Sequence, residues 1–505
     1  MKTAFVQSRP CTTGMLFCAM TFMSAVELTA CAPLVPYVQP TMQLTARPTS
    51  QSSASSNDID IASWWTSFHD PKLSSLITKL LAQNLSLQAA AARVDQARAA
   101  SREAGARELP SIEFDSGVVA QHQSMDTSIG EIARHSPYYR RNPVSFDVGV
   151  GASWEIDPGR GTQHYADARS AEADAAEGDA LALRVSLIGE MADAFLQVNA
   201  TRTRLSLLDK QILNGQHVLD VVRRRFDAGA GSQREVSLAE AAVARALSLR
   251  PALHIALVAQ TLRIDRLLGE QPGEGDGSML ARQVESDPPP APVAAMVDNQ
   301  PQELLRGRPD VVAAERRLAA AHSRVGLAVS EFYPKVSLAG LLGSTGMTGT
   351  PWLGVDGFSP QAGIGLRWRL FDFGRVQAEV DGANASEKIA IADYRMAVLS
   401  AVEDVQRSVD RRDQLADQSR GLSLEVTALE QSRNASLEAY KAGSISVSDV
   451  LLSDDQLLQA QDSLAQSSFD ELRALVDVYR SLGGGWKASR SSTSGPTVAR
   501  LNHVE

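Results

Sequence analysis

Two copies of one set of motifs follow each other along this chain, so both halves should adopt the same fold. Trp154-Glu-Ile-Asp157-Pro-Gly159-Arg160 recurs in the second half as Trp368-Arg-Leu-Phe-Asp372-Phe-Gly374-Arg375, and Leu268-Gly269 recurs as Leu482-Gly483. Solenoid repeats are much shorter, roughly 20–50 residues. The wide spacing of these matching motifs therefore indicates an internal gene duplication.

Each copy carries the same predicted order of elements: a helix, a strand pair and a long helical hairpin. The opening helix is expected from Pro71 to Glu108, and its counterpart to start after Pro309-Asp310 and end before Pro334. The strand pairs are placed at 110–156 and 334–371, and the helical hairpins at 159–269 and 374–482. The predicted organisation is a signal peptide (1–30), a lipid-anchored tether (31–70), a first repeat (71–270), a Gly/Pro-rich linker (271–300), a second repeat (301–483) and a polar tail (484–505).

The predicted strands alternate apolar residues with small or polar ones. Residues 144–154 and 362–370 show this pattern, with glycines on one face. Segments of about ten residues with a period of two are typical of strands in a transmembrane β-barrel. A soluble hairpin is the alternative, since each strand alone carries a weak signal. The charged residues between 121 and 143 predict a long polar loop.

The predicted helical hairpins are unusually long. Residues 159–229 and 374–443 contain no proline, and about 70 helical residues at about 1.5 Å each give a rod of about 105 Å. Apolar residues between Val198 and Phe226 step by three and four, which is typical of a coiled-coil seam. Gly229 and Gly443 are expected at the reversals. An ordinary amphipathic helix pair is the alternative, although a rod of this length cannot bury both flanks by itself.

The first residues read as a secretion signal. Lys2 and Arg9 precede a short apolar core, and Leu28-Thr-Ala-Cys31 resembles the bacterial lipobox, in which the cysteine is acylated. Cys31 is therefore the predicted lipid-attachment site, with palmitate-type acylation, and an ordinary signal peptide is the alternative. The following residues, rich in Pro, Ser, Thr and Gln, predict an extended tether.

Composition excludes several classes of function. A formal net charge of −10 argues against nucleic-acid binding, and three cysteines with eight scattered histidines argue against a disulfide scaffold or a metal site. Gly343-Ser-Thr-Gly-Met-Thr-Gly349 lacks the Lys-Ser/Thr ending of a phosphate-binding loop. No cofactor and no enzymatic activity are predicted.

Four strands cannot close a barrel, and an open sheet edge in lipid leaves backbone groups unsatisfied. Either the strands lie outside a membrane, or several chains contribute to one barrel. Two chains would supply eight strands and three would supply twelve, and only the larger barrels leave a lumen. The strands themselves do not fix this number.

Several motifs together carry a resemblance to a family. They are Trp64-Trp65-Thr-Ser-Phe68-His-Asp70-Pro71, Leu304-Leu-Arg-Gly-Arg-Pro309-Asp310-Val-Val-Ala-Ala-Glu315-Arg316, Phe332-Tyr333-Pro334, residues 368–375 and residues 443–452. The chain resembles a TolC-type outer membrane factor of tripartite efflux systems, in the NodT-like lipoprotein branch.

The resemblance implies a fold, partners and a function. The fold class is mainly α with a membrane β-barrel portion: a homotrimer with a shared twelve-stranded barrel and a coiled-coil α-barrel that extends into the periplasm from the outer membrane. The implied partners are a periplasmic adaptor (membrane fusion) protein, an inner-membrane pump and outer-membrane lipid. The implied function is passive conduction of drugs or small solutes to the exterior through helical tips that open like an iris.

The resemblance also implies site residues at the helical tips. Asp449 and Leu452 match the positions of the family's periplasmic gate, where the second acid of the family pattern is replaced by leucine. Asp454 and Asp455 are alternative carriers of that acid. Three converging carboxylates would repel one another and raise at least one pKa. A helix N-cap or first-turn acid is the alternative role for Asp449. Tip turns and adaptor contact are assigned to four residues: Phe226, Gly229, Tyr440 and Gly443.

Two rival functions are weighed against the channel. One is a structural coiled-coil lipoprotein that spaces envelope layers without a conducting lumen, and the alternating strands argue against it because a spacer needs no barrel. The other is a lipid-anchored periplasmic hydrolase, for which the sequence offers no constellation of catalytic residues.

Overall fold

The computed structural model describes residues 37, 61–137, 139–282, 306–347, 355 and 357–486. The predicted signal peptide, Cys31, most of the predicted tether, residues 283–300 of the linker and residues 487–505 of the tail lie outside this part. The elements are η1 (Ile61–Phe68), α2 (Pro71–Gln83), α3 (Leu85–Ala106), β1 (Ser111–Ala120), α4 (Ser128–Ala133), β2 (Val144–Ile156), α5 (Gly161–Asp227), α6 (Gln233–Leu268), α7 (Asp276–Arg282), α9 (Pro309–Ser330), β3 (Lys335–Met347), β4 (Gln361–Arg367), α10 (Arg375–Lys441) and α11 (Val447–Ser481).

The long helices predicted from the absence of proline are confirmed. α5 and α10 each contain 67 residues, a length of about 100 Å at about 1.5 Å per residue. Both begin just after an aspartate whose side chain accepts hydrogen bonds from the first backbone N–H groups of the helix. The carboxylate of Asp157 accepts from the backbone N–H of Gly159 and Gly161 at 2.9 and 2.7 Å, and Asp372 does the same in the second repeat, on Gly374 and Val376. An acidic side chain stabilises these free N–H groups at a helix N-terminus.

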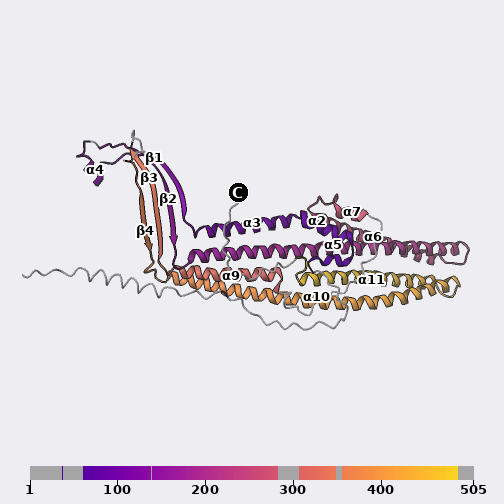
Figure 1. Cartoon of the computed structure of the whole chain (residues 1–505). Helices are drawn as coiled ribbons and strands as arrows, with labels where there is room; N and C mark the ends of the chain where they lie inside the picture. The colour runs from indigo at the N-terminus through magenta and orange to yellow at the C-terminus, as the bar shows by residue number, and fades with distance from the viewer. Residues whose placement is uncertain are drawn as a thin grey trace, which may run out of the picture. The chain divides into compact units, whose positions relative to one another are not determined.

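The helices pack mainly around α5. α5 packs against α3, α6, α9 and α11, and α10 packs against α9 and α11. Figure 1 shows α9 beside α10, and the two hairpins α5/α6 and α10/α11 with their helices side by side. Polar contacts join the hairpins: the guanidinium of Arg204 in α5 donates two hydrogen bonds to the Asp462 carboxylate in α11, at 2.6 and 2.9 Å.

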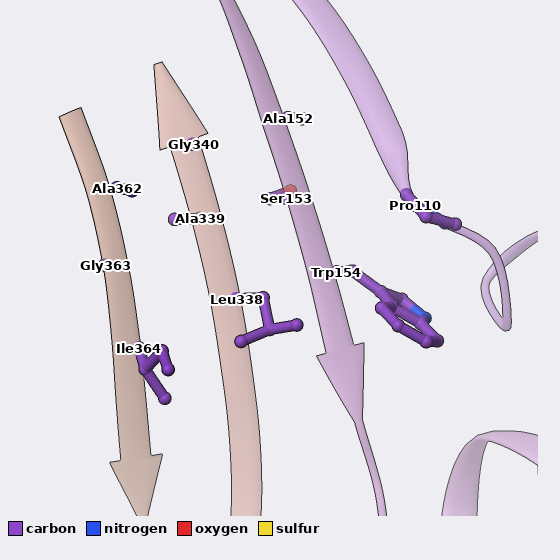
Figure 2. A pocket seen from close by; sticks show the side chains of 10 residues that line it. All are labelled: Pro110, Ala152, Ser153, Trp154, Leu338, Ala339, Gly340, Ala362, Gly363 and Ile364. Atoms are coloured by element: carbon purple, nitrogen blue, oxygen red, sulfur yellow. The ribbon is translucent and has the colours of Figure 1, made fainter. Parts of the chain in front are cut away.

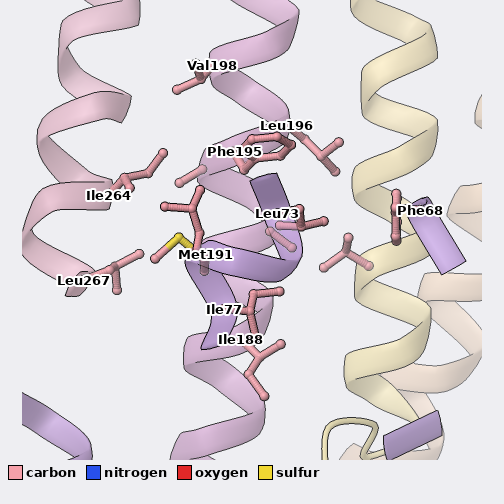
Figure 3. Close-up of a cluster of buried hydrophobic side chains, with 14 of the residues drawn as sticks. Phe68, Leu73, Ile77, Ile188, Met191, Phe195, Leu196, Val198, Ile264 and Leu267 are labelled. Carbon is pink, nitrogen blue, oxygen red and sulfur yellow. The ribbon is translucent and has the colours of Figure 1, made fainter. Parts of the chain in front are cut away.

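The main hydrophobic core brings the start of the described chain together with both hairpins. Leu73 and Ile77 of α2 pack against Ile188, Met191 and neighbouring residues of α5 and α6 (Figure 3). η1 adds Trp64, which is 1% exposed and stacks on Tyr479 of α11 with ring centroids 5.2 Å apart. The predicted tether (31–70) is therefore too long, because residues 61–70 belong to the folded core.

The four strands form one antiparallel sheet in the order β1-β2-β3-β4. The central pair, β2 with β3, joins the two sequence copies, while β1 and β4 are its edges. β4 ends at Arg367, earlier than the predicted residue 370, because β3 pairs Lys335 with Arg367 and is preceded by Pro334, which has no N–H to donate. The predicted polar loop between β1 and β2 contains a short helix, α4.

Three other predictions at the element level were wrong. The helix expected from Pro71 to Glu108 is broken at Asn84, whose extended backbone ends α2 and whose side chain caps α3 by accepting from Leu87 N–H. α9 begins at Pro309, with Arg308 rather than Asp310 at the N-cap. The linker begins with a helix, α7, whose Ser278 donates to the fully buried Asp265 at 2.6 Å.

The predicted tail also starts later than expected. The N–H of Gly485 donates to the Ile61 carbonyl at 2.9 Å, and Arg184 donates to the Gly485 carbonyl at 3.1 Å. Residues 484–486 are thus held against η1 and α5.

Candidate functional site

The sheet has two chemically different faces. The register pairs Phe114 with Val150, Val150 with Leu342, and Leu338 with Ile364. One face is therefore apolar from β1 to β4, and the opposite face carries Gly, Ser and acidic residues. On the apolar face Ile112, Phe114 and Ile364 are 73%, 69% and 79% exposed. Apolar side chains so exposed in a regular band indicate a surface that water does not cover in the working protein.

A shallow hollow marks the apolar face. Ala152, Gly340 and Ala362 lie opposite one another on β2, β3 and β4, and the larger Trp154, Leu338 and Ile364 lie beside them (Figure 2). Small residues next to large ones leave the hollow open to the surroundings. Its lining residues are apolar or glycine except for Ser153, which fits hydrocarbon better than a polar ligand.

The two central strands, β2 and β3, have the length required to cross a membrane. β2 has 13 residues, about 43 Å at about 3.3 Å per residue, or about 33 Å when tilted by about 40°. The hydrocarbon core of a bilayer is about 30 Å thick. Two tryptophans mark one end of this span: the indole N–H of Trp154 donates to the Glu108 carbonyl and that of Trp368 to the Phe332 carbonyl, each at 3.0 Å. Such anchored tryptophans are typical of membrane interfaces.

α6 also satisfies a simple length and hydropathy test for a membrane span. Among the described helices it is the one that does so, with a mean hydropathy of 1.4 in its most apolar window, of which 11% is buried. It contains Pro251 and packs along α5. Ile255 is 71% exposed, so a face of α6 is left uncovered in the single chain.

The far ends of the hairpins pack into a small tip cluster. Val218, Leu219 and Val222 of α5, Val236 and Ala239 of α6, Tyr440 of α10 and Val447 and Val450 of α11 are its buried members. The Arg225 guanidinium lies 4.7 Å from the centroid of the Tyr440 ring, and it also donates to the Tyr440 carbonyl at 3.3 Å. This cation–π contact links the two hairpins at their tips.

The glycines predicted at the reversals have the left-handed backbone that glycine favours. Gly229 has φ 73° after α5, and Gly443 has φ 77° after α10. Tyr440 is 3% exposed within the tip cluster, whereas Phe226 is 40% exposed and is not one of its members. The structure thus brings Tyr440 into contact with Arg225 and leaves Phe226 available to other surfaces.

Asp449 forms a capping box at the start of α11. Its carboxylate accepts from the Ser446 N–H at 3.0 Å and from the Ser446 hydroxyl at 2.7 Å. These hydrogen bonds, first of all the one from the hydroxyl, lower the pKa of Asp449. The single chain therefore shows the capping role, and the expected rise in pKa is not seen in it. Glu235 caps Ser232 in the same way at the start of α6, in the first repeat.

The other candidates for the gate differ in their exposure and in their partners. Leu452 is 58% exposed, one helical turn after Asp449. Asp454 is only 3% exposed and binds Arg433 of α10 at 2.8 Å, so its carboxylate is turned between the two helices. Asp455 accepts from Gln459 at 2.9 Å and lies 3.9 Å from Arg245.

Arg225 and Arg433 were not predicted from the sequence. Arg225 stands in the run Arg223-Arg224-Arg225, which reads as a solvated charge cluster, and Arg433 has no motif around it. Spacing gave no signal for the contact either, since Phe226 is the residue equivalent to Tyr440 and Ala439 is the one equivalent to Arg225. Cys31, the predicted lipid-attachment site, lies outside the described residues. Among the described residues, no group of three or more His, Cys, Asp or Glu is placed to hold a metal ion.

Comparison with known proteins identifies relatives along nearly the whole chain. The family model described as "Outer membrane efflux protein" matches residues 76–270 and 300–484. The pyoverdine export outer membrane protein OpmQ of Pseudomonas putida is 31% identical over 442 residues, covering 84% of this chain and 88% of that protein. Nodulation protein T of Rhizobium leguminosarum bv. trifolii is 26% identical over 469 residues, covering 91% and 95%.

The solved structure of the outer-membrane channel OprN superimposes with a TM-score of 0.82 at 28% sequence identity. It covers 90% of this chain and 100% of its own. The open-state outer membrane channel MtrE of Neisseria gonorrhoeae shares the fold, with a TM-score of 0.76.

Proposed function

This chain belongs to the outer membrane efflux protein family, and we propose that three copies of it form the outer-membrane channel of a tripartite efflux system. The observation that carries the proposal is the two-faced sheet with two unpaired edges, β1 and β4. Pairing both edges of such a sheet requires other chains, and three copies give twelve strands, enough for a water-filled lumen. The apolar face then contacts lipid, and the face with glycine and acidic residues lines the lumen.

The long helices continue this tube into the periplasm. α5 and α10 extend about 100 Å, and the uncovered apolar face of α6 is then covered by a neighbouring copy. A periplasmic adaptor protein contacts the tips around Phe226, Gly229, Tyr440 and Gly443, and an inner-membrane pump supplies the solute. Relatives described as serving pyoverdine export and as part of a toluene efflux pump support a small-molecule cargo. Transport through the channel is passive and needs neither a cofactor nor enzymatic catalysis.

The periplasmic gate consists of Asp449 and Leu452 in this proposal. Both side chains are exposed on one face of α11, one turn apart. Three copies would place a ring of carboxylates next to a ring of leucines. The acidic ring attracts cations, and the apolar ring favours dewetting of a narrow constriction. Asp454 does not contribute to the gate, because its carboxylate is engaged by Arg433.

Cys31 carries the lipid in this proposal, and the protein resides in the outer membrane. Cys31→Ser should abolish acylation but leave the oligomer able to form, because the strands provide the main anchor. Fractionation of membranes and native gels check this. Monomers in the soluble periplasmic fraction would contradict it.

Conductance in planar bilayers tests the channel. Wild-type protein should conduct weakly, and the double variant Asp449→Ala/Leu452→Ala should conduct several-fold more, because both rings are removed. Glu425→Ala, an exposed acid of α10 away from the tip, serves as the matched control and should behave like wild type. Absence of conductance from every variant would favour the alternative, a structural coiled-coil lipoprotein without a lumen.

A further inference from the structure

The two short helices α3 and α9 occupy equivalent places in the two repeats but have different surroundings. Each contains 22 residues, and Leu85 and Ala106 of α3 correspond to Pro309 and Ser330 of α9. α9 packs on two long helices, α5 of the first repeat and α10 of its own repeat. Of the long helices, α3 packs on α5 of its own repeat. Among the described elements, none therefore covers on α3 the second packing surface that α9 uses.

The contact between α9 and α5 shows how the second repeat packs against the first. At Gly178 of α5 the helices approach so closely that a Cβ would lie 2.9 Å from the Cβ of Ala313. The adjacent Asp179 forms an ion pair with Arg317 of α9. At the other end, a Cβ on Gly159 would lie 3.0 Å from the Cα of Ser330, which is fully buried.

The equivalent positions of α10 and α3 carry matching residues, but these residues do not contact each other within the described chain. Asp393 of α10 corresponds to Asp179, and Arg93 of α3 corresponds to Arg317. Both Asp393 and Arg93 are exposed, and neither has an ion-pair partner within the described part of the chain. Gly374, the counterpart of Gly159, has no atom within 4 Å of a Cβ built on it. Ala106, the counterpart of the buried Ser330, is exposed.

α10 also presents a hollow where the helix would lie. It is lined by Lys388, Ile391, Ala392, Arg395, Met396 and Leu399. This stretch corresponds to the surface of α5 around Gly178 that α9 covers. Leu85, in the first turn of α3, is 64% exposed, and it corresponds to the buried Pro309, which packs at Gly178. The apolar hollow on α10 could thus accept the exposed Leu85 of α3, and the two lie on different surfaces of one chain.

We infer that α3 of a second copy docks on the exposed face of α10, with Arg93 of one copy paired to Asp393 of the other. The internal contact between α9 and α5 is the template for this contact between copies. The inference rests on the oligomer of the proposed function, and it names the surfaces that join its copies. Because the receiving and the docking surface differ, the contact is head-to-tail, the kind of contact that forms a ring when the rotation between copies closes.

A second copy explains the α10 face better than lipid does. Lys388, Asp393 and Arg395 interrupt the apolar residues, and charged groups in hydrocarbon are costly. The helix α3 brings Arg93 to meet Asp393, while its exposed alanines allow close approach. Ala392 carries a Cβ where α5 has Gly178, so the docked helix lies slightly farther out than α9 does from α5.

Cross-linking of paired cysteines tests the inference directly. The natural cysteines are confined to positions 11, 18 and 31, so Arg93→Cys/Asp393→Cys adds an isolated pair. A short bifunctional thiol reagent should link this variant into dimers and trimers on a denaturing gel. The matched control, Asp179→Cys/Arg317→Cys, places the equivalent pair within one chain and should remain a monomer on that gel. Each single-cysteine variant should give no ladder.

The outcomes separate this inference from the proposed function. Oligomers of normal mass with no 93–393 cross-link would overturn the docking of α3 on α10 and leave the channel proposal standing. A purified protein that is monomeric in membrane-like detergent would contradict both.

Charge exchange provides a second measurement that does not depend on cysteine chemistry. Arg93→Asp and Asp393→Arg should each lower the temperature at which the oligomer dissociates, and the double variant should recover most of the loss. Arg102→Asp is the matched control, since its counterpart on α9 is Gly326, which carries no charge. Equal effects of Arg93→Asp and Arg102→Asp, with no recovery in the double variant, would overturn the inference.

Discussion

Asp454 is 3% exposed, and Arg433 of α10 is the charged group that compensates it. Its second oxygen is buried without a hydrogen-bond partner in the described structure. Removing the arginine would leave a buried unpaired carboxylate, which costs roughly 3–5 kcal/mol. We therefore expect Arg433→Leu to lower the thermal midpoint of helix unfolding, measured by circular dichroism, far more than an ordinary surface substitution does.

Two further variants make this prediction specific. Arg433→Leu/Asp454→Leu removes both charges and should recover most of the stability, because an apolar pair of similar volume replaces the ion pair. Arg420→Leu breaks an exposed pair with Asp417 and should cost no more than about 1 kcal/mol. If Arg433→Leu behaved like Arg420→Leu, Asp454 would not be buried as described.

His164 lies at the start of α5 with its ring against Gly326 of α9. Burial is the main cause that lowers its pKa, and Arg160 and His322 lower it further against the opposing effect of Asp167. The folded state thus binds its proton less readily than the unfolded state, whose histidine pKa is about 6.5. Stability from His164 is present above that pH and is lost as the pH falls through the lower folded-state pKa.

This sign gives a measurable pH dependence. The thermal midpoint should fall between about pH 7 and pH 5, and His164→Phe, which keeps the ring but cannot titrate, should flatten that part of the profile. His217→Gln changes an exposed histidine of α5 and should leave the profile unchanged. An identical slope in wild type and His164→Phe would show that other groups cause the acid sensitivity.

At the scale of elements, the sequence predicted what depends on repeated local patterns. The absence of proline, the glycines at 229 and 443 and the period-two strands were sufficient for the long helices, their reversals and the sheet. The break at Asn84 was missed because Asn is tolerated within helices. What fixes the break is a distant contact, since the Asn84 side chain donates to the Leu267 carbonyl at 2.6 Å. Arg308 makes the corresponding contact in the second repeat, where its guanidinium donates to the Ser481 carbonyl.

The reversal at Gly443 allows an element-scale prediction. Its φ of 77° is left-handed, a conformation that costs a residue with a Cβ roughly 1–2 kcal/mol. Gly443→Ala should therefore increase hydrogen exchange in residues 440–450. Gly421→Ala is the matched control: this glycine lies inside α10 with nothing within 4 Å of a Cβ, so alanine there should stabilise by about 0.5–1 kcal/mol. Equal protection of the tip in both variants would contradict the prediction.

At the scale of the whole molecule, the sequence did not predict the contacts between copies, because these contacts are not formed within one chain. The alternating strands and the edge problem predicted that other chains are needed, but not which surfaces meet. The capping of Asp449 also shows the limit: in one chain the carboxylate binds Ser446, whereas the proposed gate depends on its distance from two other copies. Such distances depend on assembly and cannot be read from a local motif.

The acids on the polar face of the sheet lead to a prediction for conduction. Glu113, Asp115 and Asp147 share that face, because Asp115 lies opposite Gly149 and Asp147 opposite Gly117. Arg367 is 3.7 Å from Glu155 near the other end, so it balances Glu155 rather than these three. Three copies would line the lumen with nine carboxylates, and a wall of one sign raises the local concentration of counter-ions.

The open channel should therefore prefer cations, and Glu113→Gln/Asp115→Asn/Asp147→Asn should reduce the preference several-fold. The reversal potential in a potassium chloride gradient measures it. The difference should be large at about 0.1 M salt, where the Debye length is about 10 Å, and small at about 1 M, where it is about 3 Å. Neutralising Asp126 and Glu131, which lie in the connection between β1 and β2, serves as the control. An unchanged potential in the triple variant at low salt would mean that the polar face of the sheet does not line the conduction path.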